Sequence, residues 1–116
     1  MSLHFTRRAI QDIRDIHEFS VSKWGVKVAD QYIDAFEETL SLLESYPNVL
    51  SKKSQISKHF LAYQSGNHLL ICDKTDRDVF VLTIQHVSLN LFENLNDLEP
   101  TLKSEMEILH REIGKD

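Results

Sequence analysis

The chain contains few of the residues that interrupt secondary structure or form disulfide bonds. It has one cysteine, two prolines and three glycines in 116 residues. A single cysteine excludes an internal disulfide, and so little Gly and Pro argues against long linkers or disorder. No apolar run is long enough to cross a bilayer, and the N-terminus lacks the basic and apolar pattern of a secretory signal. These absences predict a single cytoplasmic domain without a membrane partner.

Common catalytic and ligand-binding signatures are also missing. The chain contains no GxGxxG, Walker loop, HExxH, CxxC or GxSxG. No two of its six histidines have the i, i+4 spacing that would bring two imidazoles to one metal ion. The one thiol, Cys72, lies in an apolar run, which predicts a buried and inert side chain. We therefore expect neither a metal nor a cofactor.

The net charge of the chain argues against nucleic acid as its main partner. Thirteen Lys and Arg against 18 Asp and Glu give a formal net charge of −5. A protein that chiefly binds phosphate backbones usually has a basic surplus. Any nucleic-acid contact would therefore depend on a local patch, and bases gather at Arg7–Arg8 and at Lys52, Lys53 and Lys58.

Two helices are predicted in the first half of the chain. Residues Gly25–Pro47 have no internal Gly or Pro, and their apolar positions recur every three or four residues, which places them on one helical face. A helix over Arg7–Lys23 precedes them, with Thr6 as its N-cap and Gly25 at its end. Asp12 is expected on its solvated face. So short a connection predicts an antiparallel helical hairpin.

The second half predicts strands and then a third helix. Residues 59–64, 68–73 and 79–87 are apolar or β-branched runs separated by polar turns, so they predict three antiparallel strands. Residues 48–58 are polar and are expected to form a loop that carries at most one helical turn. A helix is then predicted over residues 97–114, with Asp97 as its cap and Pro100 in its first turn.

The predicted fold class is therefore α+β. A short strand at Leu3–Phe5 opens it, an antiparallel helical hairpin packs on a small antiparallel β-sheet, and a C-terminal helix follows. All 116 residues are expected to form one domain, with the helices on one face of the sheet. Residues 97–114 extend beyond the compact core, and we expect their stripe of Leu98, Leu102 and Leu109 to pack on it.

Few side chains stand out as candidates for chemistry. His86, at the end of the clearest strand, can act as a general acid or base near neutral pH, or it can simply end the strand. Arg77, in the preceding turn, can contact an anion or remain a solvated turn residue. Lys52, Lys53 and Lys58 offer either a phosphate-contacting loop or a solubilising one. These alternatives stay open.

Several short groups of residues, taken in chain order, resemble the ParE-type toxins of the RelE/ParE superfamily. The groups are Phe5-Thr6, Ala9, Asp12-Ile13 and Ile16, then Trp24-Gly25, Ala29 and Tyr32-Ile33, then Leu42-Leu43 and Tyr46-Pro47, and finally Val79 to His86. The resemblance covers about residues 3–88, and the order of the groups is more specific than any single position.

The resemblance implies a toxin of a bacterial type II toxin–antitoxin, or plasmid stabilisation, module. Such toxins are neutralised by a cognate antitoxin that lays an extended or helical segment over them. ParE-like members inhibit DNA gyrase and are not hydrolases, whereas RelE-like members cleave mRNA on the ribosome. A homodimer or a toxin–antitoxin hetero-oligomer is consistent with either branch.

Two departures favour the branch that inhibits gyrase by binding. The chain is acidic, and Val87 and Ser88 follow His86 where a nuclease of this kind often has a late tyrosine. The alternative is a ribosome-dependent mRNA interferase in which His86 handles the 2′-hydroxyl proton, while Arg77 or a loop lysine holds the phosphate. A third possibility is a degenerate, non-toxic binding module. The hypothesis of an enzyme is thus kept as the alternative.

Overall fold

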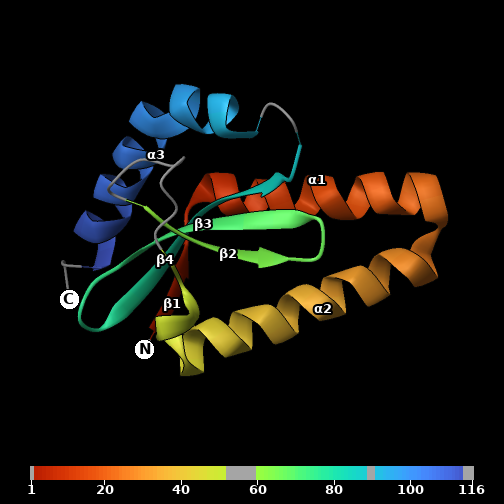
Figure 1. Cartoon of the computed structure of the whole chain (residues 1–116), viewed down its shortest axis with the longest axis horizontal. Coiled ribbons are helices and arrows are strands. Elements are labelled where there is room, and N and C mark those ends of the chain that lie inside the picture. Colours follow the sequence, from red (N-terminus) through yellow and green to blue (C-terminus); the bar gives the residue numbers. More distant parts are fainter. Residues whose placement is uncertain (1, 52–59, 89–90, 114–116) are drawn as a thin grey trace.

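The structure consists of one four-stranded sheet with helices on both of its faces (Figure 1). The computed structural model describes residues 2–51, 60–88 and 91–113. In chain order the elements are β1 (Ser2–Phe5), α1 (Arg7–Trp24), α2 (Val26–Ser45), a 3₁₀ turn (Pro47–Val49), β2 (Leu61–Ser65), β3 (His68–Lys74), β4 (Asp78–His86) and α3 (Leu91–Ile113). The predicted α+β class and element order are confirmed.

The sheet is mixed, with strand order β1-β4-β3-β2. β3 pairs antiparallel with both β2 and β4, as the short polar turns predicted. β1 instead pairs parallel with β4, with Leu3 opposite Val79 and Phe5 opposite Val81. A parallel pair needs a long connection between its strands, and the two helices and two strands between β1 and β4 provide one.

The helical hairpin forms as predicted and covers one face of the sheet. Gly25 joins α1 to α2 with φ of +90°, a conformation that L side chains rarely adopt. The apolar faces of both helices pack on alternate residues of β3 and β4. The buried members of this cluster are Ala9, Phe36, Leu43, Leu50, Leu70, Cys72, Val79, Val81 and Ile84.

The third helix covers the opposite face, which corrects the expectation that all helices share one face. The other alternate residues of β3 and β4, such as Ile71 and Phe80, point toward α3. The buried members of this second cluster are Phe60, Ala62, Leu69, Ile71, Phe80, Leu82, Leu91, Leu95 and Leu102. Leu98 and Leu109 pack against it, so the predicted packing of this helix is confirmed.

The start of α3 was predicted wrongly. The helix begins at Leu91, so Asp97 is not its cap and Pro100 lies in its interior. Leu91 and Leu95 extend the stripe of Leu98 and Leu102 toward the N-terminus with the same spacing. Burial of that longer stripe offsets the backbone hydrogen bond that proline cannot donate.

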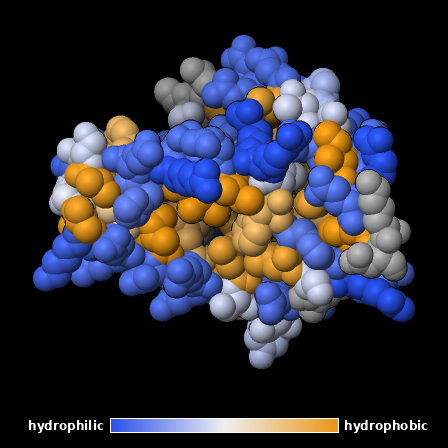
Figure 2. Space-filling model, turned by 180° about the vertical axis from the view of Figure 1, so that it is seen from behind, coloured by the Kyte–Doolittle hydropathy of each residue, from blue (hydrophilic) through white to orange (hydrophobic). Residues whose placement is uncertain are grey.

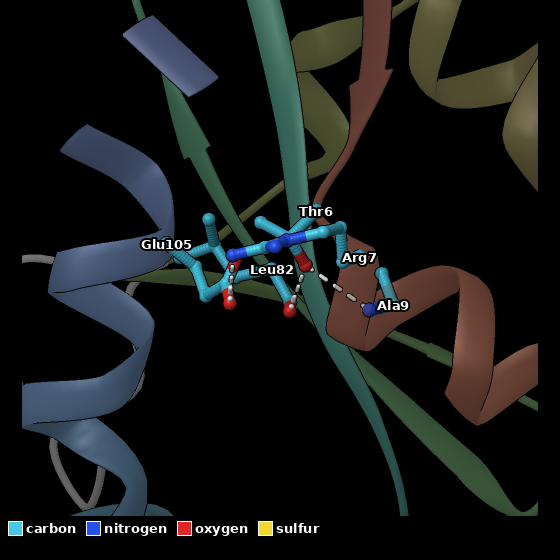
Figure 3. A network of polar contacts seen from close by, with 5 residues as sticks. All are labelled: Thr6, Arg7, Ala9, Leu82 and Glu105. Atoms are coloured by element: carbon cyan, nitrogen blue, oxygen red, sulfur yellow. Dashed lines mark hydrogen bonds and ion pairs between the residues drawn. The ribbon is translucent and has the colours of Figure 1, made fainter. Parts of the chain in front are cut away.

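Thr6 fastens α1 to the sheet (Figure 3). Its buried hydroxyl accepts from the Ala9 N–H at 3.0 Å, as an N-cap does, and donates to the Leu82 carbonyl at 2.7 Å. The register of β3 and β4 shifts at this point, and Leu82 has no residue directly opposite it in β3. Thr6, the predicted cap, therefore also binds β4 at the position where its register with β3 shifts. The guanidinium of the neighbouring Arg7 lies 3.4 Å from the Glu105 carboxylate of α3.

Candidate functional site

The two helices of the hairpin run past the end of the sheet (Figure 1). Beneath this overhang lies a hollow of about 490 Å³, which we call the overhang groove. Its wall on α1 consists of residues on one side of the helix, and its floor comes from α2 and from the ends of β3 and β4. The lining residues are Asp15, Ile16, Phe19, Ser20, Lys23, Trp24, Tyr32, Asn67, His68 and His86.

The floor of the groove is a cluster of aromatic rings around two histidines. His68 at the start of β3 lies directly opposite His86 at the end of β4, and their ring centroids are 5.3 Å apart. The Tyr32 hydroxyl is hydrogen-bonded to His68 Nδ1. Phe36 closes the far side, with centroids 5.2 Å from Tyr32 and 5.7 Å from His68. Gly66, with φ of +57°, lies in the turn between β2 and β3 that leads into His68.

The two imidazoles differ in electrostatic character. Burial, and then the neighbouring His86, lower the pKa of His68 from 6.5 to about 4. His68 is thus neutral at physiological pH and offers one ring nitrogen as donor and the other as acceptor. His86 is exposed at the groove. The hydrogen bond between His68 and Tyr32 orients these two side chains relative to one another.

Acid is expected to destabilise the fold through His68. In the unfolded chain this imidazole takes up a proton near pH 6.5, whereas in the folded chain it resists protonation until about pH 4. Its contribution to stability is therefore complete above pH 6.5 and is lost as pH falls toward 4. Because the side chain is only half-buried, we expect this loss in the free energy of unfolding to be about 1–2 kcal/mol. Denaturant unfolding between pH 7 and 4 measures this loss.

The variant His68→Gln separates this effect from the titration of other groups. Asp12, for example, has a pKa raised chiefly by burial, so protonation of Asp12 works in the opposite direction. The advantage in free energy of unfolding that wild type has over His68→Gln should shrink as pH falls from 7 to 4. Equal pH dependence in the two proteins would contradict the assignment to His68.

The surface at the tip of the helical hairpin, which includes Phe19 and Trp24 of the groove lining, is unusually apolar for a solvated surface. Phe19, Trp24 and Val26 are 61%, 55% and 60% exposed, and Val28 is exposed beside them. The Lys23 ammonium lies over the two aromatic rings, 5.6 Å from the Phe19 centroid and 5.0 Å from that of Trp24. Figure 2 shows hydrophobic residues at the hairpin end of the molecule and around a hollow near its middle. We call Phe19, Trp24, Val26 and Val28 the hairpin-tip patch.

The structure does not bring the two predicted site residues together. His86 lies on the floor of the groove, but Arg77 is exposed in the turn at the other end of β4. Nine residues of extended chain separate them, which is about 30 Å. They cannot act on one phosphodiester, so a nuclease would need another cation, and Lys23 is the one in the groove lining. Lys52, Lys53 and Lys58 lie outside the described residues.

The sequence did not predict the roles of two further residues, His68 and Asp12. His68 was only part of an apolar run, and its pairing with His86 depends on strand register. Asp12, expected to face solvent, is partly buried and accepts from the Thr83 hydroxyl and from the Ile84 N–H, the latter at 3.0 Å. Burial raises its pKa in spite of these hydrogen bonds. The helical period places Asp12 at the edge of the apolar face, but only the sheet supplies its partners.

Other candidate chemistry finds little support in the structure. Cys72 is buried, and burial raises the pKa of its thiol to about 12, which confirms the predicted inert cysteine. Residues 2–51, 60–88 and 91–113 contain no group of three His, Cys, Asp or Glu side chains placed to bind a metal ion. No helix within these ranges is both long and apolar enough to cross a membrane.

Comparison with known proteins supplies the family. The family described as the ParE toxin of type II toxin–antitoxin systems, parDE, matches residues 3–90. Toxin ParE1 of Caulobacter vibrioides is 26% identical over 85 residues, which are 73% of this chain and 88% of that protein. The fold is similar to a solved structure of the chromosomal ParDE system from P. aeruginosa, with a TM-score of 0.68 and 19% identity over 76% of this chain and 97% of that one.

The family match begins at β1 and ends before α3, so it contains the sheet, the helical hairpin and the overhang groove. It covers well over half of the 116 residues. The chain belongs to the ParE toxin family of type II toxin–antitoxin systems.

Proposed function

We propose that this ParE-family toxin acts by binding and inhibiting DNA gyrase, and that its cognate antitoxin neutralises it by binding the toxin. The observation that carries the proposal is the hairpin-tip patch. Four large apolar side chains lie exposed within ten positions of the chain, and they project from the part of the hairpin that has no sheet beneath it. Apolar patches of this kind mark protein–protein contacts.

The geometry gives less support to the mRNA interferase. Acid–base cleavage needs a base, an acid and a cation around one phosphodiester. Of the predicted pair only His86 lies at the groove, and its neighbour His68 is neutral at physiological pH. One observation still favours the mRNA interferase as a second candidate: His86, Tyr32 and Lys23 line the same groove. A test must therefore separate the two activities.

The first test is induced expression of the chain alone in a bacterial host, with DNA, RNA and protein synthesis followed separately. DNA synthesis is expected to fall first, and purified chain is expected to inhibit supercoiling by purified gyrase. His86→Ala should change that inhibition by less than about twofold, because binding needs no proton transfer, whereas a general acid or base contributes about 10²–10⁴-fold.

The other outcomes favour the alternatives. If protein synthesis falls first and His86→Ala abolishes the effect, the chain is an mRNA interferase. If no synthesis falls while folded protein accumulates, the chain is a non-toxic binding module. Either result would overturn the proposed inhibition of gyrase.

A further inference from the structure

His68 and His86 bring two imidazoles together at one end of the sheet. They lie directly opposite each other in the antiparallel pairing of β3 and β4, so both side chains extend from the same face of the sheet. Tyr32 and Phe36 of α2 contact His68 on this face, and both histidines line the overhang groove. The expectation of no metal considered only helical spacing, which cannot identify a pair that strand register creates.

From this geometry we infer that the His68–His86 pair is a binding site for a divalent transition-metal ion, and that the ion it suits best is Zn²⁺. Imidazole is a ligand that zinc prefers in proteins. The inference goes beyond the proposed function and does not depend on it, because it concerns only the folded chain and a metal ion.

The separation of the two rings fits two bonds to one tetrahedral ion. A Zn–N bond is about 2.0–2.1 Å long, and a ring nitrogen lies about 1.1 Å from its own centroid, so two imidazoles on one tetrahedral zinc have centroids about 5 Å apart. The centroids of His68 and His86 are 5.3 Å apart. Their planes are nearly perpendicular, at 88°, which one ion accommodates because each ring can rotate about its own metal–nitrogen bond.

The hydrogen bond between His68 and Tyr32 leaves Nε2 of His68 as the metal ligand. In the tautomer that carries its proton on Nδ1, His68 donates to the Tyr32 oxygen and presents an unprotonated Nε2. Metal-bound histidines commonly donate their other ring N–H to an oxygen in this way, which fixes the orientation of the ring. Burial lowers the pKa of His68 to about 4, so zinc need not displace a second proton at physiological pH.

Water in the groove would supply the remaining ligands. Among residues 2–51, 60–88 and 91–113, no third His, Cys, Asp or Glu joins the pair in a group that could hold a metal ion. His86 is exposed and the groove has a volume of about 490 Å³, so the two other positions of a four-coordinate ion can be filled by water. Asp15 and Lys23, on the α1 wall, carry opposite charges that offset each other. The site is therefore open, with two bonds from the chain.

The test is a calorimetric titration of ZnCl₂ into the full chain, which is prepared without an affinity tag and freed of metal with a chelator. We expect one ion to bind per chain. His86→Gln removes one ligand at an exposed position. It should weaken zinc binding at least about tenfold, because changes to residues that only orient a metal ligand already cost about 10–100-fold in affinity.

The matched control is His17→Gln, which removes a histidine of α1 that is paired with Asp30 at 3.0 Å. It should leave the zinc affinity unchanged. His68→Gln removes the other ligand and is the second site variant in case His86→Gln alters the fold, and circular dichroism checks all three proteins. Absence of zinc binding by wild type, or wild-type affinity in either folded site variant, would overturn the inference.

A measurement on wild type needs no substitution. In NMR spectra of the imidazole protons, added ZnCl₂ should shift the resonances of His68 and His86 together, while those of His4, His17 and His110 stay in place. Shifts confined to other histidines would locate the metal elsewhere and contradict the site. Neither gyrase nor antitoxin takes part in these experiments, so their failure and the failure of the proposed function are distinguishable.

Discussion

Removal of α3 is expected to unfold the protein. The helix buries Leu91, Leu95 and Leu102 completely or nearly so against the sheet. Burial of one leucine side chain contributes about 1.5–3 kcal/mol, so the three together contribute about 5–9 kcal/mol. This is comparable with the whole stability of a domain, about 5–15 kcal/mol. A chain ending at residue 90 should therefore lack a cooperative unfolding transition and bind a hydrophobic dye.

A single substitution in α3 should have a smaller effect on stability in the same direction. Leu102→Ala should lower the free energy of unfolding by about 2–5 kcal/mol, because Leu102 is fully buried and its neighbours can only partly close the cavity. Ser104→Ala, at an exposed position two residues along α3, should change it by less than about 0.5 kcal/mol. Urea unfolding followed by circular dichroism measures both values.

The opposite outcome would be informative. If the chain ending at residue 90 kept the unfolding midpoint of the full chain, α3 would be a loosely attached addition to a self-sufficient domain. The family match ends at residue 90, so this experiment also asks whether the matched part folds alone. We propose that residues 91–113 are an integral half of the core in this protein, although they follow the family-matched region.

Phe36→Ala is expected to be the most damaging single substitution on the hairpin side. Phe36 is 2% exposed and contacts both Tyr32 and His68 under the overhang groove. Loss of a buried phenylalanine typically costs about 3–5 kcal/mol. The same change should let water reach His68 and return its pKa toward 6.5, because burial is the main cause of its lowering.

Two measurements check this prediction. Denaturant unfolding gives the loss of stability, and an NMR titration of the imidazole protons gives the pKa of His68. Phe36→Leu should lose less, about 1–2 kcal/mol, since most of the buried volume stays. Glu37→Ala, exposed on the next position of the same helix, is the control. A stable Phe36→Ala protein with an unchanged His68 titration would contradict the packing role of this ring.

Much of the local structure was predictable because its causes are local. Thr6 can accept from a backbone N–H one turn ahead, and Gly25 can adopt a positive φ, so the ends of α1 were predicted within one residue. The apolar periods of α1 and α2 identified their packed faces. The apolar and β-branched runs at residues 68–73 and 79–87 predicted two strands, and the structure has them as β3 and β4.

The predictions for the start of α3 and for Asp12 were wrong because contacts between distant segments determine both features. Pro100 pointed to a helix start nearby, but packing of Leu91 and Leu95 on the sheet carries α3 through the proline. Asp12 lies on a mostly polar side of α1, and its hydrogen-bond partners Thr83 and Ile84 belong to β4, far away in the chain. Neither effect is encoded in the neighbouring residues.

The sequence by itself determined the helical hairpin, the three antiparallel strands and the resemblance to ParE-type toxins, since periodicity and turn residues act over a few positions. Only the tertiary structure decided how these parts meet. The pairing of His68 with His86 depends on the register between β3 and β4, and the overhang groove exists because α1 and α2 are longer than the sheet they cover. Register and overhang are relations between segments far apart in the chain, so no local pattern specifies them.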